Sequence, residues 1–260
     1  MAVNFDYGSK NVLGPHAWCK FCPEAGGEKQ SPINIIYSKC STDTSLSSLK
    51  ITTKSSSKMT LIRKAHNFQV SAPGAAELQG GPLQGRYTLA QFHFHWDESS
   101  NNGSEHLING KAFCSELHLV FVNSKYADFA AALKQPDGLA VVGILLHTAS
   151  SDMAGLTQLA EVLAKSAPNA ECAMPNDYDL NSLLPGNLQN YFTYSGSLTT
   201  PPCTECVTWL VLSTAVPITE KTLDVMRNTH ANCKDCNTCS NARPVCPLGA
   251  RCIKSSFQLS

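Results

Sequence analysis

The chain has 260 residues and carries 20 basic and 20 acidic side chains, so its formal net charge is zero and its isoelectric point is about 7.0. This charge balance gives no electrostatic attraction to nucleic acid or to an anionic membrane, and we expect neither as a partner. The longest apolar run, LAVVGILL at 139–146, is far too short for a transmembrane segment, which needs roughly 20 residues.

Strand-like runs dominate the chain. Apolar, β-branched and aromatic residues mark five of them: MTLIRK from 59, RYTLAQFHFHW from 86, AFCSELHLVFV from 112, LAVVGILL from 139 and CVTWLVL from 206. Helical periodicity is scarcer, and it appears at 128–134 before Pro136, at 156–163, and at 223–226 behind Pro217. Strands that outnumber helices without regular alternation predict a mainly β or α+β protein, built on a large twisted, mixed and mostly antiparallel sheet with short peripheral helices. We expect a single domain over 1–260, with a cysteine-containing N-terminal segment at 1–29 and a cysteine-rich tail at 233–252.

The stretch QFHFHW at 91–96 places two histidines on alternate positions of an expected strand. Side chains alternate between the two faces of a strand, so one face carries Tyr87, Leu89, Gln91, His93 and His95. The other face carries Thr88, Ala90, Phe92, Phe94 and Trp96 and faces the core. Two imidazoles at this spacing can share a metal ion, but taken alone the pair is more typical of packed or surface histidines.

The next expected strand contributes a third histidine. Glu116 and His118 lie on one of its faces, together with Cys114, Val120 and Val122. Three neutral nitrogen donors with one open position are the ligand set of a catalytic zinc ion. Gln91 and Glu116 would then accept hydrogen bonds from the imidazole N–H groups and fix their tautomers, although each also fits a strand residue with no chemical role.

Twelve cysteines are many for a domain of this size, and five of them fall within the last 28 residues. Such a content favours disulfides and an oxidising compartment. The alternative is a zinc site built on Cys233, Cys236 and Cys239, with Cys246 or Cys252 as the fourth ligand.

Two further features bear on the compartment. The sequon Asn102-Gly103-Ser104 agrees with secretion. The first residues, MAVNFDYG, lack the basic and apolar regions of a signal peptide, so we expect this chain to be the mature form of a secreted protein.

An ordered series of motifs resembles the α-class carbonic anhydrases, in particular the secreted, disulfide-containing members. The motifs are QSPINI at 30–35, QFHFHW at 91–96, GSEH at 103–106, ELHLV at 116–120, DGLAVVGI at 137–144, YSGSLTTPP at 194–202, ECVTW at 205–209 and the final segment at 241–257. The resemblance implies reversible hydration of carbon dioxide to bicarbonate, with zinc at the base of a conical cleft and inhibition by sulfonamides. The alternative is a non-catalytic relative that acts as a binding or mineral-matrix protein; loss of a zinc histidine would favour it, and none is lost.

The resemblance also implies roles for individual residues. The zinc ligands would be His93, His95 and His118, supported by Gln91, Glu116 and the backbone of Asn241. Thr199 would accept a hydrogen bond from the attacking oxygen and so orient it, and its own hydroxyl would donate to Glu105. The substrate pocket would be formed by Val120, Val141, Leu198, Thr199, Thr200 and Trp209.

The remaining implied roles concern the proton and the cysteines. His66 would export the proton with the help of Tyr7 and Gln69, while Lys64 stands where many members have a small polar residue. Cys203 would pair with Cys22, for which Cys19 is a competitor. His106 is expected to make a structural hydrogen bond, and the oligomeric state stays open.

Overall fold

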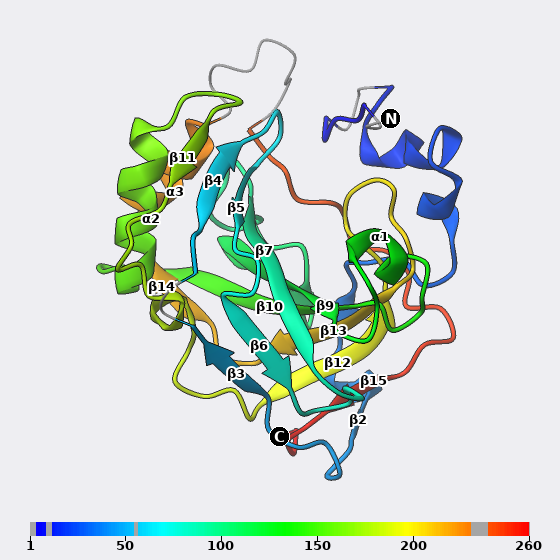
Figure 1. Cartoon of the computed structure of the whole chain (residues 1–260). Helices are drawn as coiled ribbons and strands as arrows, with labels where there is room; N and C mark the ends of the chain where they lie inside the picture. The colour runs from blue at the N-terminus through cyan, green and yellow to red at the C-terminus, as the bar shows by residue number, and fades with distance from the viewer. Residues whose placement is uncertain (1–3, 9–11, 55–56, 230–238, 260) are drawn as a thin grey trace.

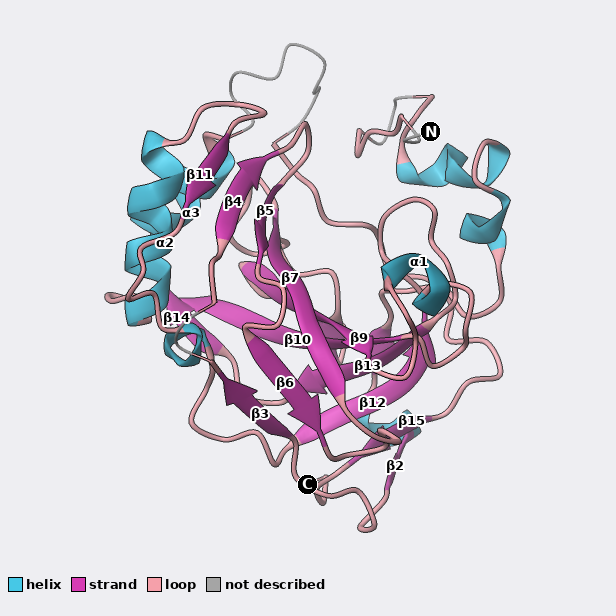
Figure 2. Cartoon of the chain, in the orientation of Figure 1, coloured by secondary structure: helices cyan, strands magenta, loops and turns pink. Residues whose placement is uncertain are grey.

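A computed structural model of the chain describes residues 4–8, 12–54, 57–229 and 239–259 (Figure 1). A sheet of 13 strands forms its centre, in the order β11-β4-β5-β7-β9-β10-β13-β12-β15-β2, with β14 beside β10 and with β6 joining β3 to β7. A separate two-stranded sheet pairs β1 with β8. Strands are the dominant element in Figure 2, as the sequence predicts.

The strands have the following bounds: β1 (Asn34–Ile35), β2 (Cys40–Thr42), β3 (Lys50–Thr53), β4 (Thr60–Arg63), β5 (Phe68–Ser71), β6 (Ala76–Gln79), β7 (Tyr87–Trp96), β8 (Leu107–Ile108), β9 (Ser115–Asn123), β10 (Leu139–Thr148), β11 (Glu171–Ala173), β12 (Tyr191–Gly196), β13 (Val207–Leu212), β14 (Val216–Ile218) and β15 (Ile253–Ser255). The α-helices are α1 (Phe129–Ala132), α2 (Ala154–Lys165) and α3 (Glu220–Arg227). The 3₁₀ helices are η1 (Pro15–Lys20), η2 (Pro23–Gly26), η3 (Tyr37–Lys39) and η4 (Leu180–Leu183).

The pairing of the central strands confirms the predicted mixed sheet. Antiparallel ladders join β7 to β9 and β9 to β10, whereas β10 and β13 run parallel. The uninterrupted apolar run LAVVGILL forms most of β10, and all eight of these residues are buried. A strand that is covered on both faces needs apolar side chains on both. This explains why apolar and polar residues do not alternate along this segment.

The predicted faces of β7 are wrong at its beginning. The register with β9 shifts between Leu89 and Gln91, so Ala90 is an extra residue in the ladder. A bulge of this kind reverses the alternation of side chains. Tyr87 and Leu89 therefore join the same core cluster as Phe92 instead of sharing the histidine face.

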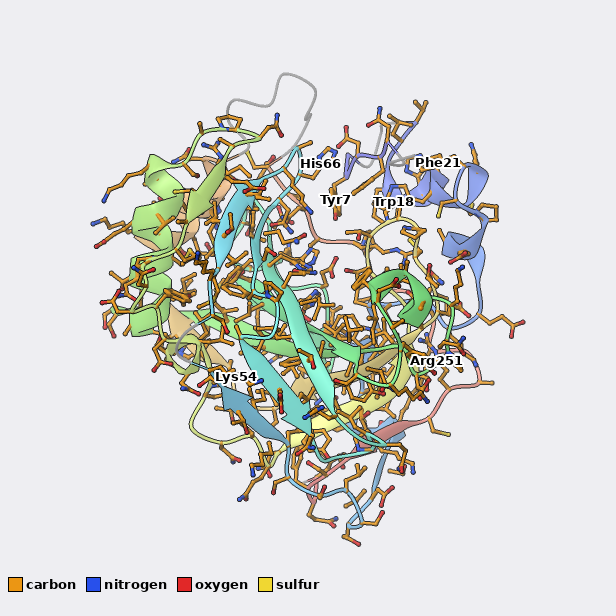
Figure 3. All side chains as sticks on the ribbon, viewed as in Figure 1. Tyr7, Trp18, Phe21, Lys54, His66 and Arg251 are labelled. Carbon is orange, nitrogen blue, oxygen red and sulfur yellow. The ribbon has the colours of Figure 1, made fainter. Side chains whose placement is uncertain are left out.

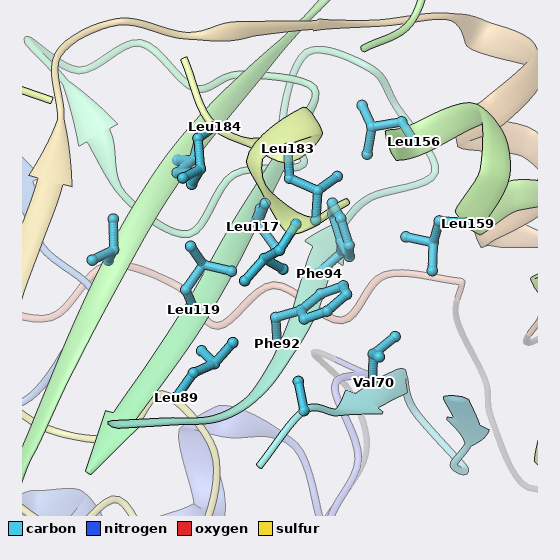
Figure 4. Packing of buried hydrophobic residues seen from close by; sticks show 14 of the residues in the cluster. Val70, Leu89, Phe92, Phe94, Leu117, Leu119, Leu156, Leu159, Leu183 and Leu184 are labelled. Atoms are coloured by element: carbon cyan, nitrogen blue, oxygen red, sulfur yellow. The ribbon is translucent and has the colours of Figure 1, made fainter. Parts of the chain in front are cut away.

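Two hydrophobic clusters fill the space on either side of the sheet. The larger one packs Phe92 and Phe94 of β7 against Leu117 and Leu119 of β9 and against Leu156 and Leu159 of α2 (Figure 4). In Figure 1, α2 and α3 lie together at one side of the sheet, at the left of the view. The smaller cluster contains Val120, Val141 and Trp209, on the face that carries His118.

Two features of the chain bear on the expected tail and on membranes. Cys233 and Cys236, part of the alternative cysteine zinc site, lie outside the described residues. The described part of the tail is tied to the domain, since the N–H of Asn241 donates to the carbonyl of Trp96 and that of Cys246 to the carbonyl of Pro32. Within the described ranges no helix combines the length and apolarity needed to cross a membrane.

Candidate zinc centre

Three histidines converge from two neighbouring strands. His93 and His95 lie on β7, and His118 lies directly opposite His93 on β9. Their ring centroids are 4.7 to 5.3 Å apart. One nitrogen from each ring falls within 4.8 Å of the others, so the three rings can bind one metal ion.

Each ring uses its other nitrogen for a hydrogen bond within the protein. The Nδ1 of His93 donates to Gln91 Oε1 at 2.9 Å, and the Nδ1 of His95 donates to the carbonyl of Asn241 at 2.8 Å. The Nε2 of His118 donates to Glu116 Oε1 at 2.8 Å. These bonds leave the lone pairs of His93 Nε2, His95 Nε2 and His118 Nδ1 for a metal.

A zinc ion fits the donors present. The Nε2 of His95 is buried and has no hydrogen-bond partner, which is costly unless a metal ion occupies its lone pair. Three imidazole nitrogens with one remaining position suit catalytic zinc. The second group of potential ligands, His106, Glu116 and His118, is already joined by hydrogen bonds at 2.6 and 2.8 Å.

Burial keeps the three imidazoles neutral, as metal binding requires. It holds the pKa of His93 well below the ordinary value, with further lowering from His95 and His118. It lowers the pKa of His95 to about 3 and also lowers that of His118, where the charge of Glu116 opposes the shift. A charged imidazole is disfavoured in such surroundings, so the nitrogen lone pairs are available at neutral pH.

Glu116 organises the base of the site. Its Oε1 accepts from His118 and from the Nδ1 of His106, and its Oε2 accepts from the backbone N–H groups of Glu105 and His106 at 3.0 and 2.7 Å. Burial acts to raise the pKa of Glu116, but His106 and His118 outweigh it and lower that pKa well below the usual range. His106 is also bonded to the hydroxyl of Tyr194 at 2.7 Å, which bears out its expected structural role.

Glu105 and Thr199 meet beside the histidines. Both are buried, and the Oε2 of Glu105 has no hydrogen-bond partner among the described residues. The backbone N–H of Arg243 donates to Glu105 Oε1 at 2.8 Å. Burial and the charge of Glu116 raise the pKa of Glu105, while the Thr199 side chain and the N–H of Arg243 oppose the shift. The positive charge of a bound zinc ion likewise favours the ionised carboxylate.

The apolar residues of the expected substrate pocket lie on the His118 side of the sheet. Val120, Val141 and Trp209 are buried, and the Trp209 ring packs 4.8 Å from the His118 ring. Leu198 is half-buried against the same cluster. Thr200, next to the buried Thr199, is also half-buried.

His66 lies at the loop between β4 and β5, close to the N-terminal segment. Figure 3 shows it facing Tyr7 across this part of the molecule. Its ring centroid is 5.8 Å from that of Tyr7 and 5.2 Å from that of Phe5. Gln69, on β5, pairs with His93 in the ladder, and its Oε1 accepts a hydrogen bond from Lys64.

The side chain of Asn241 makes contacts that the sequence does not reveal. Only its backbone was expected to contribute, by serving His95. Its Oδ1 also accepts from the N–H of Trp96 at 2.7 Å, and its Nδ2 donates to the carbonyl of His66 at 3.0 Å. Tyr194 and Arg243 were missed as well, because each acts through a partner that is distant in the sequence.

The ten described cysteines are free thiols in the structure, so the expected bridge between Cys22 and Cys203 is not formed in it. The two residues are nevertheless neighbours, since the Cys22 thiol donates to the carbonyl of Pro202, the residue before Cys203, at 3.0 Å, and the Cys203 side chain acts to lower the pKa of Cys22. Cys19, the competitor, is exposed.

Three neutral imidazoles placed to hold one metal ion, next to a buried hydroxyl and a buried acid, define the site of a zinc enzyme that would activate water. The family model for the eukaryotic-type carbonic anhydrases matches residues 13–257, and the chain belongs to this family. Carbonic anhydrase 7 of Homo sapiens and that of Mus musculus are each 38% identical to it over 252 residues, which cover 94% of this chain and 95% of each relative. The protein is therefore a zinc lyase that hydrates carbon dioxide reversibly.

Proposed function

We propose that this carbonic anhydrase works in an oxidising, extracellular compartment and divides its chemistry among four groups of residues. The catalytic role in this proposal rests on three imidazole nitrogens, one from each histidine, that lie within 4.8 Å of one another. The second nitrogen of each ring is already hydrogen-bonded within the protein. Zinc, when bound there by His93, His95 and His118, supplies a hydroxide nucleophile near neutral pH by acidifying water.

Thr199 and Glu105 orient the attacking oxygen. A threonine hydroxyl that donates to a carboxylate has its own oxygen left as an acceptor only. It therefore fixes the direction of the proton on the nucleophile and turns a lone pair toward the substrate. Glu105 is held for this task by the N–H of Arg243 and by burial on all sides.

Carbon dioxide is held by apolar contacts. It is uncharged and a poor hydrogen-bond partner, so a site lined by Val120, Val141, Leu198 and Trp209 excludes water without leaving polar groups unpaired. Thr200 provides a hydroxyl on the same loop for the more polar product. Anionic sulfonamide nitrogen suits the same metal and hydroxyl, so aromatic sulfonamides are expected to inhibit.

His66 exports the proton. Imidazole is the side chain that most readily accepts and releases protons near neutral pH. His66 packs against Phe5 and Tyr7, and Gln69, three residues further along the chain on β5, pairs with His93 in the ladder between β5 and β7. Tyr7 and Gln69 would hold the water molecules that carry the proton.

The extracellular assignment rests on the cysteines. Twelve thiols, the sequon at Asn102 and the contact between Cys22 and Cys203 support it. Oxidation would join these two residues and close a loop of about 180 residues, which in the chain-entropy model stabilises by roughly 4 to 5 kcal/mol. Peptide mapping without reduction, on protein made under oxidising conditions, tests this pairing; a free Cys203 thiol there would refute it.

The catalytic assignment is tested by zinc stoichiometry and stopped-flow carbon dioxide hydration. One zinc ion per chain and rapid turnover are expected, and each of His93→Ala, His95→Ala and His118→Ala should lose both. Undiminished turnover in any of the three would refute the ligand set. A zinc-loaded protein that does not hydrate carbon dioxide would instead favour the binding or mineral-matrix alternative.

A further inference from the structure

Lys64 is the first residue of the loop between β4 and β5. Its backbone N–H donates to the carbonyl of Asn67 at 2.6 Å, which closes the turn. Its ammonium does not extend freely into solvent but donates to Gln69 Oε1 at 2.6 Å. This contact directs the charge along β5, although the residue as a whole is exposed.

Gln69 places that charge beside the zinc ligands. It is the ladder partner of His93 in the antiparallel pair of β5 and β7. Opposed residues in an antiparallel pair project to the same face, so the side chains of Gln69 and His93 are neighbours.

Solvent reaches the zinc centre on the side where Gln69 and His93 lie. His93 is half-buried, as are Gln69 and Gln91, whereas His95 and His118 are buried. The partly exposed side of the centre therefore adjoins His93 and the group formed by Lys64 and Gln69.

No carboxylate among the described residues forms an ion pair with Lys64. Its partner Gln69 is neutral, and an ammonium has two more N–H groups to donate. The acids nearest the zinc ligands, Glu105 and Glu116, are buried and hydrogen-bonded to other groups.

We infer that Lys64, held in place by Gln69, forms an anion-attracting subsite beside the zinc ligands and raises the affinity of the centre for small monovalent anions, bicarbonate among them. Carbon dioxide is uncharged and gains nothing from this lysine. The subsite acts on the anionic partner of the reaction, so it rests on the zinc centre proposed above.

Thiocyanate is a suitable probe because it is a small monovalent anion that stays ionised at any working pH. Its Kd is measured by calorimetry on zinc-loaded protein, at one pH, with zinc content determined for each variant. The series is Lys64→Arg, Lys64→Met and Lys64→Glu, which keeps, removes and reverses the charge. Lys54→Met is the matched control: it removes one positive charge far from His66 in Figure 3, where Lys54 pairs with Glu77 at 2.7 Å.

The Kd should rise roughly three- to tenfold in Lys64→Met and further in Lys64→Glu, as expected for one charge acting through partly solvated surroundings. Lys64→Arg and Lys54→Met should bind as the parent does, and the differences should shrink at about 0.15 M salt. An unchanged Kd across the zinc-loaded series, or an equal change in Lys54→Met, would overturn the subsite. Parent protein that fails to hold zinc would instead refute the zinc centre itself.

Discussion

Glu116 offers a sharp test of how the site is built, because one carboxylate serves four donors. It accepts from the rings of His106 and His118 and from two backbone N–H groups, at 2.6 to 3.0 Å, and it is 0% exposed. In Glu116→Gln the amide has almost the same shape, but one acceptor oxygen becomes an NH₂ group. That group faces donors whichever way the amide is turned.

The expected loss follows from those contacts. Two of the four hydrogen bonds disappear, and each leaves a buried donor unpaired at about 1 to 3 kcal/mol. The free energy of unfolding of the zinc-free protein should therefore fall by roughly 2 to 6 kcal/mol. Zinc affinity should fall about 10- to 100-fold, since the partner that orients His118 is weakened.

Two measurements separate these effects. Denaturant unfolding of the zinc-free variant gives the stability change, and competition with a chelator gives the zinc Kd. Gln91→Ala is a useful comparison, since it removes the partner of His93 at a half-buried position where water can replace it. If Glu116→Gln unfolds within about 0.5 kcal/mol of the parent and keeps its zinc affinity, the carboxylate does not hold the site together.

Three other predictions address separate parts of the chain. His66→Ala should lower kcat for carbon dioxide hydration in dilute buffer but leave kcat/KM nearly unchanged, because proton export follows the chemical step. Imidazole buffer should restore kcat. An unchanged kcat in stopped-flow measurements would show that another group carries the proton. Burial raises the pKa of Cys203 to about 12, so at pH 8 iodoacetamide should label the exposed Cys19 well before Cys203 in reduced, folded protein; mass spectrometry that finds equal rates would contradict this. Arg63→Met should lower the free energy of unfolding by about 2 to 4 kcal/mol without changing zinc affinity. The reason is that the Arg63 guanidinium donates to the carbonyls of Ser166 and Thr229, just beyond the ends of α2 and α3. Denaturant curves that superimpose on those of the parent would rule out this role.

The ligand-bearing strands β7 and β9, and the central strands β10 and β13 next to them in the sheet, could be predicted because their signal is local. β7, β9, β10 and β13 are six to ten residues long and rich in β-branched and aromatic side chains. By contrast β3, β5 and β6 have four residues each, too few for a clear period. β5 and β6 pair with the longer β7, and β3 pairs with β6, so their pairing is decided by backbone hydrogen bonds to strands elsewhere in the chain, a tertiary effect that sequence patterns do not carry.

The bulge in β7 shows a second limit. Strict alternation predicts that Tyr87 and Leu89 share a face with His93, but one extra residue at Ala90 reverses the order. Nothing in the sequence RYTLAQF marks that position, because a bulge depends on how the partner strand is held. The histidines were nevertheless placed correctly, since their spacing lies entirely on the regular side of the bulge.

Asn241 illustrates why part of the site escapes sequence reasoning. The group that orients His95 is a backbone carbonyl 146 residues further along the chain, and every residue has such a carbonyl. What distinguishes position 241 is a side chain that fixes its own backbone: its Oδ1 accepts from Trp96, and its Nδ2 donates to the carbonyl of His66. One amide thereby connects the strand that carries two zinc ligands to the loop that carries His66, the residue proposed to export the proton. In the proposed mechanism, metal binding and proton export thus depend on a shared support, even though the residues assigned to them are far apart in the sequence.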